Sequence, residues 1–250
     1  MKIFLLFITL FFSLTLCAQD ANVLIKQAEQ FEASMNDEQA IVKYKEALKL
    51  QPGNLYIVCK CSELCSRIGG RFKTDKMKMT DYYTAAKVYA DRAIMLDPKS
   101  SEANFVMAMV IGRTAMQKAG KEKLNSVRDI KKYAELAIRY DPNNFKAWHI
   151  LGKWFYEISI LNFFERATAQ ILYGTLPKAS INDAISAFEK SKELNPAMLL
   201  NYLELAKAYK KNSEDSKAEL LLKAMLRLPL KNEDDPRIIA EGTALLKKWN

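Results

Sequence analysis

Residues 145–196 constrain the fold more than any other part of the chain. They contain two segments whose apolar residues recur every three or four positions, the spacing of one face of an α-helix. Gly152 lets the first helix approach the second closely, and Pro196 ends the second helix because it has no amide hydrogen to donate. One helix pair cannot bury its own apolar face, so we expect neighbouring pairs. The residues expected to pack within this pair are Trp148, Leu151, Gly152, Phe155, Ala184 and Phe188.

The same pattern recurs along the chain, and each unit closes on a proline. This order of residues resembles the tetratricopeptide repeat, which has a period of 34 residues. It predicts an all-α fold, a right-handed superhelix (α-solenoid) of about five helix pairs with long inserts. The closing residues are Pro52, Pro98, Pro142, Pro196 and Pro229. The predicted repeats span about 21–54, 55–100, 101–144, 145–198 and 199–231.

Three of the units are longer than the period, with inserts at 69–81, about 117–126 and 159–180. Each insert falls between the two helices of a pair, so it should lengthen helices or loops on one edge and leave the stacked core intact. We expect the last insert to continue its first helix before folding back at a turn over 174–177. Acidic residues and a proline then predict a C-terminal capping helix at about 235–249.

The first 18 residues have the anatomy of a secretory signal peptide. Lys2 precedes an unbroken apolar run, and a small residue, Ala18, precedes the expected cut. Residues 19–250 would then form the repeat domain, exported to the periplasm or the extracellular space. The alternative is a lipoprotein cut before Cys17, although the bulky Leu16 is unusual at such a site.

The charge balance narrows the class of partner. With Lys2 removed, 37 of the 38 basic residues remain against 29 acidic ones. This excess favours acidic partners or membrane surfaces. We expect no nucleic-acid partner outside the cytoplasm, and no integral membrane segment after signal cleavage.

Few residues could support catalysis. His149 is the single histidine and lies in a repeat helix, so a structural or groove-lining role is favoured. Cys61 and Cys65 occupy packing positions of their helix, where a buried cysteine behaves as a small hydrophobe. The alternative for the third thiol, Cys59, is an intermolecular disulfide. We therefore predict no enzyme, no catalytic residue, no metal site and no cofactor.

The interior groove is the better candidate for function. In repeat superhelices the first helix of each pair lines the concave side. Acidic residues gather at the start of this face and basic residues at its end, which favours recognition of an extended, partly acidic segment. A solvated face without a ligand remains the alternative. The predicted partner-binding residues are Arg67, Phe105, Arg113, Lys146, His149, Lys153, Tyr156, Lys207 and Lys211.

The repeats and inserts together resemble the regulator of microtubule dynamics family. The resemblance covers residues 40–249 and rests on HILGKWFYEI, FFERATAQILYGTLPKAS, AISAFEKSKELNP and LRLPLKNEDDP in that order. It implies an α-helical repeat domain without catalytic activity, association with microtubules and, for one member, lipid binding and transfer. An exported chain meets no microtubules, so the fold but not that role is carried over. The most distinctive residues are Trp154, Glu165, Arg166, Ala169, Gly174, Thr175 and Pro177.

Two functional hypotheses follow. The first is an exported, non-catalytic scaffold that binds a protein or peptide in its concave groove. The second is a domain that binds a lipid or another amphiphile, which the family resemblance and the aromatic insert around Phe163 and Phe164 suggest.

Overall fold

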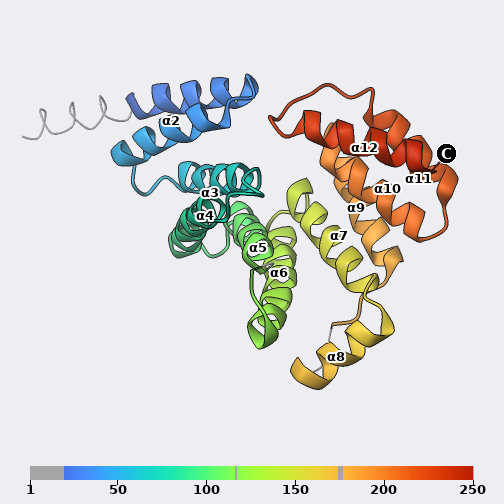
Figure 1. Ribbon diagram of the computed structural model, residues 1–250. Helices are drawn as coiled ribbons and strands as arrows, with labels where there is room; N and C mark the ends of the chain where they lie inside the picture. The colour runs from blue at the N-terminus through green and yellow to red at the C-terminus, as the bar shows by residue number, and fades with distance from the viewer. Residues whose placement is uncertain (1–19, 116, 174–176, 250) are drawn as a thin grey trace, which may run out of the picture. The chain divides into compact units, whose positions relative to one another are not determined.

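The computed structural model describes residues 20–115, 117–173 and 177–249. The predicted signal peptide, its cleavage site and the turn residues Gly174 and Thr175 lie outside the described residues. Every regular element in the described part is a helix (Figure 1). Among the described residues, no helix combines the length and apolar character needed to cross a bilayer. The predicted all-α fold of helix pairs with inserts and a C-terminal capping helix is confirmed.

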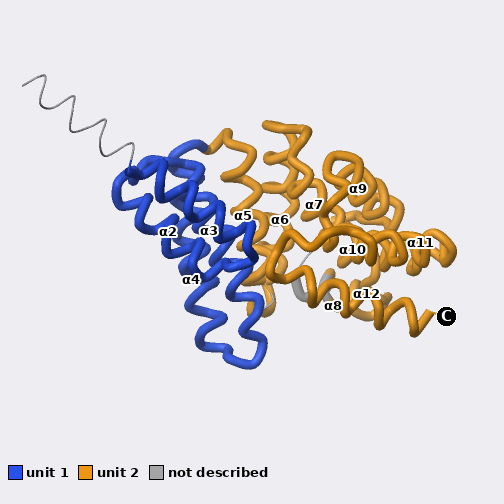
Figure 2. The backbone as a smooth tube through the Cα atoms, turned by 90° about the horizontal axis from the view of Figure 1, so that it is seen from above, with its two compact units in different colours: residues 1–97 blue, residues 98–250 orange. Residues whose placement is uncertain are grey.

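The chain divides into two compact units, residues 1–97 and residues 98–250 (Figure 2). In unit 1, α3 packs against both α2 and α4. Asparagine or aspartate side chains cap the starts of α2, α3 and α4, each accepting a hydrogen bond from a backbone amide three residues ahead. The helices of unit 1 are the described residues 20–33, α2 (Asp37–Leu50), α3 (Leu55–Gly69) and α4 (Lys76–Leu96).

Unit 2 contains three further pairs, in which α5 packs on α6, α7 on α9 and α10 on α11. The last helix, α12, contacts both α10 and α11. These helices are α5 (Ser101–Ala115), α6 (Gly120–Tyr140), α7 (Phe145–Ser159), α8 (Phe163–Tyr173), α9 (Ile181–Leu194), α10 (Leu199–Lys211), α11 (Asp215–Met225) and α12 (Asp235–Trp249).

The pair α7 and α9 approaches closely at Gly152, as its sequence pattern predicts. A Cβ atom at Gly152 would lie 2.7 Å from Cδ1 of Phe188, a side chain with no exposed surface. Ser191 on α9 donates a hydrogen bond to the carbonyl oxygen of Phe145 at 2.8 Å, which ties the start of α7 to the last turn of α9. The absence of a side chain at Gly152 therefore sets the distance between the two helices.

The first two inserts lengthen the second helices of their pairs. α4 and α6 each have 21 residues, whereas α2 and α9 have 14. Seven extra residues add about 10 Å of helix at 1.5 Å per residue. The prediction that inserts extend one edge and spare the packed core is confirmed for these two pairs.

The prediction for the third insert is wrong. α7 does not continue into it but ends at Ser159, and a separate helix, α8, begins at Phe163. The physical reason is a reciprocal cap: Asn162 Oδ1 accepts from the amide of Glu165 at 2.9 Å, and the Glu165 carboxylate accepts from the amide of Asn162 at 2.8 Å. This arrangement satisfies amides that a new helix start would otherwise leave unpaired.

Two of the family-distinctive residues hold this insert region in place. Arg166 on α8 donates from Nη2 to the carbonyl oxygen of Ile158 at 2.8 Å, near the end of α7. Trp154 on α7 is buried and donates from Nε1 to the carbonyl oxygen of Val127 on α6 at 2.7 Å. α8 also contacts α6. These residues therefore position the insert, a task that an ordinary repeat does not have.

α12 covers the apolar face of the last pair. Ile238 packs with Leu222 and Met225 in a buried cluster, and Trp249 lies against the edge of the same cluster. The buried Asp235 carboxylate accepts from the backbone amides of residues 231 and 232, at 2.7 and 2.8 Å, and so fixes the loop that leads into the helix.

Candidate functional site

The three described cysteines belong to the core of unit 1. Cys61 and Cys65 have no exposed surface, and Cys59 is 2% exposed. Burial is the main cause that raises the pKa of Cys61 to about 12 and that of Cys65 to about 11, so both are thiols at neutral pH. The packing prediction is confirmed. The alternative of an intermolecular disulfide through Cys59 is contradicted, because its side chain is covered.

His149 is also buried, between α7, α9 and α10. Its Nδ1 lies 2.9 Å from Oδ1 of Asn201, and its ring lies 5.5 Å from that of Phe188. Asn201 donates from Nδ2 to the carbonyl oxygen of Phe188 at 2.8 Å, which turns its Oδ1 toward the histidine. Nδ1 of His149 must then carry the hydrogen. Burial lowers the pKa of His149 below its ordinary value, so the ring is neutral at pH 7.

A chain of alternating charges crosses α7, α10 and α12, and we call it the charge chain. At its centre Glu204 is 8% exposed and accepts from Lys153 at 2.6 Å and from Lys207 at 2.9 Å. Each lysine also reaches a second, more exposed carboxylate: Lys153 lies 2.8 Å from Glu157, and Lys207 lies 2.8 Å from Glu241. Three acids and two bases give the charge chain a net charge of −1.

The central carboxylate is ionised despite its burial. Desolvation acts to raise the pKa of Glu204, but the charges of Lys153 and Lys207 outweigh it and hold the pKa below its ordinary value. For each lysine, burial acts to lower the pKa, whereas Glu204 raises it above the usual range. Glu204, Lys153 and Lys207 are therefore all charged near neutral pH. The positive charges of Lys153 and Lys207 are already compensated within the protein.

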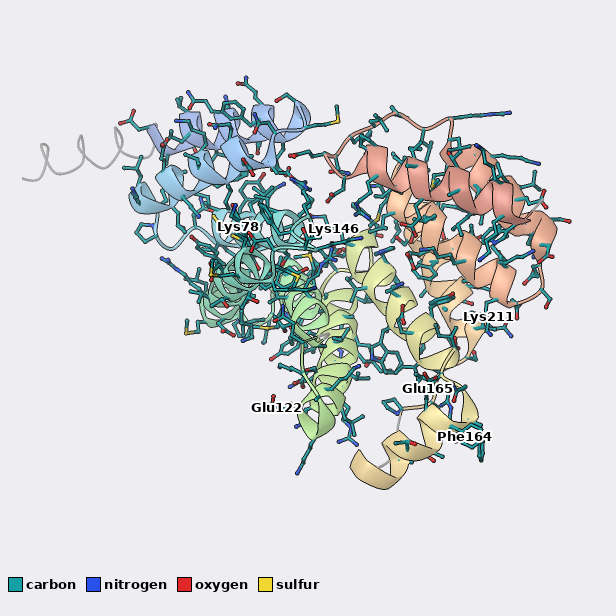
Figure 3. The ribbon with its side chains drawn as sticks, viewed as in Figure 1. Lys78, Glu122, Lys146, Phe164, Glu165 and Lys211 are labelled. Atoms are coloured by element: carbon teal, nitrogen blue, oxygen red, sulfur yellow. The ribbon has the colours of Figure 1, made fainter. Side chains whose placement is uncertain are left out.

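The other predicted groove residues of unit 2 differ in their access to solvent. Phe105 is only 4% exposed, with the Lys146 ammonium 5.1 Å from the centre of its ring. This corrects the prediction of Phe105 as a groove-lining residue, because its side chain on α5 belongs to the buried core. Lys146 also pairs with Glu102 at 3.2 Å. Tyr156 is half-buried beside Lys153, whereas Arg113 and Lys211 are exposed. Figure 3 labels Lys146 and Lys211.

Arg67 lies in unit 1. It donates to both oxygens of the buried Asp37, at 2.7 and 2.6 Å, and to Glu32 at 3.3 Å. Arg71 bonds the same aspartate. Such a paired, part-buried guanidinium holds α2 against α3. The structure thus brings Lys153, Tyr156 and Lys207 together in unit 2, whereas Arg67 belongs to unit 1. His149 is buried, which corrects its prediction as a groove-lining residue.

Sequence reasoning missed Asn201, Glu204 and Glu241, which complete this site. A local signal existed for one contact, since Glu204 and Lys207 are three residues apart on one helix face. The contact from Lys153 to Glu204 spans 51 residues, and that from Lys207 to Glu241 spans 34. These contacts depend on how the helices are placed, which no local pattern reveals.

Comparison with known proteins agrees with this architecture. The family model described as Regulator of microtubule dynamics protein 1-3 matches residues 24–250. The chain belongs to the regulator of microtubule dynamics family. A Caenorhabditis elegans relative, Regulator of microtubule dynamics protein 1, is 30% identical over 195 residues, covering 78% of this chain and 84% of the relative. The family resemblance found in the inserts is therefore confirmed.

Mammalian members of the regulator of microtubule dynamics family are longer than the matching region. The Bos taurus protein 1 is 25% identical, with 85% of this chain and 66% of the relative covered. The Rattus norvegicus protein 2 is 26% identical, with 65% of this chain but only 40% of the relative covered. This chain thus corresponds to part of those proteins.

Two solved structures share the fold. A tetratricopeptide-repeat protein of Thermus thermophilus, TTC0263, superposes with a TM-score of 0.65 at 13% identity, covering 90% of this chain and 99% of that one. PilF of Pseudomonas aeruginosa superposes with a TM-score of 0.54 at 14% identity, covering 93% and 92%. Both support the helical-repeat fold of this family member.

Proposed function

We propose that this chain is a non-catalytic helical-repeat scaffold that binds a protein or peptide partner on the first helices of its repeats. The observation that carries the proposal is the charge chain, whose outer members stay exposed while Glu204 is buried. Ion pairs that already exist in the free protein reduce the cost of ordering side chains on binding. Half-buried Tyr156 beside Lys153 adds an aromatic contact of the kind enriched in interfaces.

The structure changes which residues should recognise an acidic segment. Lys153 and Lys207 are paired with Glu204, so this role falls to the exposed Arg113 and Lys211. The predicted signal peptide supports a periplasmic or extracellular site of action. Export, the partner and its charge are all part of the proposal.

The test is affinity capture of partners from the protein's own cell envelope, with proteins and lipids identified by mass spectrometry. A charge exchange, Glu157→Lys with Lys211→Glu, alters two exposed side chains on α7 and α10 and keeps the net charge. A matched exchange, Lys190→Glu with Glu193→Lys, alters an exposed pair on α9.

We expect a stoichiometric protein partner that is lost with the first exchange and kept with the second. Equal capture by both variants would show that the charge chain and its neighbours do not form the binding surface. Loss in both would indicate a non-specific dependence on surface charge.

A second candidate function is the binding of a lipid or another amphiphile. The observation that favours it is the pair Phe163 and Phe164 at the start of α8, each 79% exposed with ring centres 5.7 Å apart. Figure 3 shows Phe164 on this helix beside Glu165. Native mass spectrometry after gentle extraction should then show a bound lipid that a Phe163→Ser, Phe164→Ser variant loses. A clean apo mass for the wild type would contradict this function.

A further inference from the structure

The turn that leads into α4 carries an exposed basic patch, which we define as Lys73, Lys76, Met77 and Lys78. All four side chains are exposed, and Met77 has 74% of its surface in solvent. Figure 2 shows the turn between α3 and α4 at one end of unit 1. The nearby carboxylate Asp75 serves as the N-cap of α4 and lies 4.0 Å from Lys78. Asp81 lies one turn further along.

The patch has a fixed support. The rings of Phe72 and Tyr82 are stacked, with centres 5.7 Å apart and planes 10° from parallel. The ammonium group of Lys78 lies 5.3 Å from the centre of the Phe72 ring. Figure 3 labels Lys78 in the first turn of α4. The stacked rings therefore hold the turn from which the lysines project.

Helix stability does not explain these lysines. The amino-terminal end of a helix carries a partial positive charge, so acidic residues are favoured there and lysines are disfavoured. The first turn of α2 has Asp37 and Glu38, and that of α9 has Asp183. Three other helices, α3, α7 and α10, also begin without an acid, but the first turn of α4 in addition contains two lysines, Lys76 and Lys78. This local cost suggests that the lysines serve an interaction outside the helix.

We propose that the basic patch is a contact surface for an anionic lipid bilayer. An apolar side chain between lysines matches a bilayer interface, because Met77 can enter the acyl boundary while the lysine stems lie along it and the ammonium groups reach the headgroups. An acidic peptide would account for the lysines but not for the exposed Met77. The surface is in unit 1 and is independent of the partner site proposed for unit 2.

The test is co-sedimentation of the protein with vesicles of 30% phosphatidylglycerol in phosphatidylcholine. Vesicles of pure phosphatidylcholine are the neutral control. The protein used for this test begins at Gln19, the first residue after the predicted cleavage site. It contains every described helix, and the apolar signal segment cannot contribute to vesicle binding. Each lysine near an anionic surface contributes about fivefold to partitioning at low salt. We expect binding to the anionic vesicles only, weakened by roughly twentyfold or more in a Lys76→Glu, Lys78→Glu variant.

Two controls separate binding from folding. The same double variant should unfold within a few degrees of the wild type, because the gain from acids in the first turn of the helix offsets the loss of the Lys78 contacts with Asp75 and Phe72. If its midpoint falls further, the methionine variants below decide whether the patch binds the bilayer. Met95 is 77% exposed at the other end of α4, away from the basic patch. Met77→Asp should weaken binding several-fold, whereas Met95→Asp should not.

Three results of the vesicle experiments would overturn the proposal. These are unchanged binding by the double lysine variant, equal loss with Met77→Asp and Met95→Asp, and equal binding to neutral vesicles. Binding to polyglutamate without binding to vesicles would also overturn it and would assign the patch to an acidic protein.

Discussion

Glu204 determines how the lysines around it behave. Its carboxylate is nearly covered by protein, and it stays ionised because two ammonium groups lie within hydrogen-bonding distance. Removing charge from one side of such a network leaves an uncompensated charge in a poorly hydrated place, which is more costly than the loss of an exposed ion pair. The lysines are therefore structural first, whatever else they bind.

Reversing the charges of Lys153 and Lys207 should destabilise unit 2. In a Lys153→Glu, Lys207→Glu variant, two new carboxylates would face Glu204, and we expect a loss of about 3 kcal/mol in the free energy of unfolding. Urea denaturation measures this value. The matched control, Lys247→Glu with Lys248→Glu, makes the same charge change at exposed positions of α12 and should shift it by less than about 1 kcal/mol. Equal shifts would show that Glu204 is not a structural centre.

Acid should weaken the fold through His149. Because burial lowers the pKa of His149 in the folded state, the unfolded chain binds more protons as the pH falls below its ordinary value of 6.5. Stability contributed by the neutral ring is thus present above pH 6.5 and is lost as the pH falls toward the folded pKa. A His149→Gln variant should show a flatter dependence between pH 7 and 5 in urea denaturation. The same slope in both proteins would contradict this account.

The structural roles of single residues were partly predictable from the sequence. The packing roles of Gly152, Phe188 and the cysteines follow from their repeat positions, because those positions face a neighbouring helix in any repeat of this kind. The burial of Phe105 and the pairing of Lys153 with Glu204 did not follow, since they depend on side chains brought together from distant segments.

At the scale of elements, two of the glycines buried at helix contacts, Gly152 and Gly242, should respond differently to alanine. At Gly152 the new Cβ would press on the ring of Phe188, which is fully buried, so Gly152→Ala should cost about 1–3 kcal/mol. At Gly242 it would meet the terminal methyl of Met225, the end of a flexible side chain. Both variants gain about 1 kcal/mol in helix propensity, so the strain at each contact decides their order. Thermal denaturation should rank Gly242→Ala as the more stable variant; the reverse order would contradict the rigid contact at Gly152.

Helix boundaries were predictable where capping residues and prolines mark them, as at α2, α9 and α12. The separate helix α8 was missed although a signal was present. Asn162 followed three residues later by Glu165 is a helix-start pattern, but the apolar spacing beyond it also fits a continuation of α7. Periodicity alone does not distinguish one long helix from two, because both have the same period.

For the whole molecule, the capping helix substitutes for a next repeat. Repeat arrays need a terminal element that covers the last apolar face. A chain ending at Asn232 would expose Leu222 and Met225, which are otherwise fully buried, and should aggregate or unfold at a lower temperature. Light scattering during a thermal ramp measures both effects. A Leu245→Ala, Leu246→Ala variant should show a smaller shift of the same sign. An unchanged midpoint in the truncated chain would show that α12 is not a cap.

The three buried thiols of α3 allow the unfolding of unit 1 to be measured by cysteine labelling. Among the described residues, cysteine occurs in this helix alone, at positions 59, 61 and 65, and each side chain is covered. A thiol-reactive dye added to the chain beginning at Gln19 can therefore modify the protein only as fast as α3 becomes uncovered. The labelling rate, followed over increasing urea, would report the opening of unit 1 without any engineered probe, while unit 2 stayed silent in the same experiment.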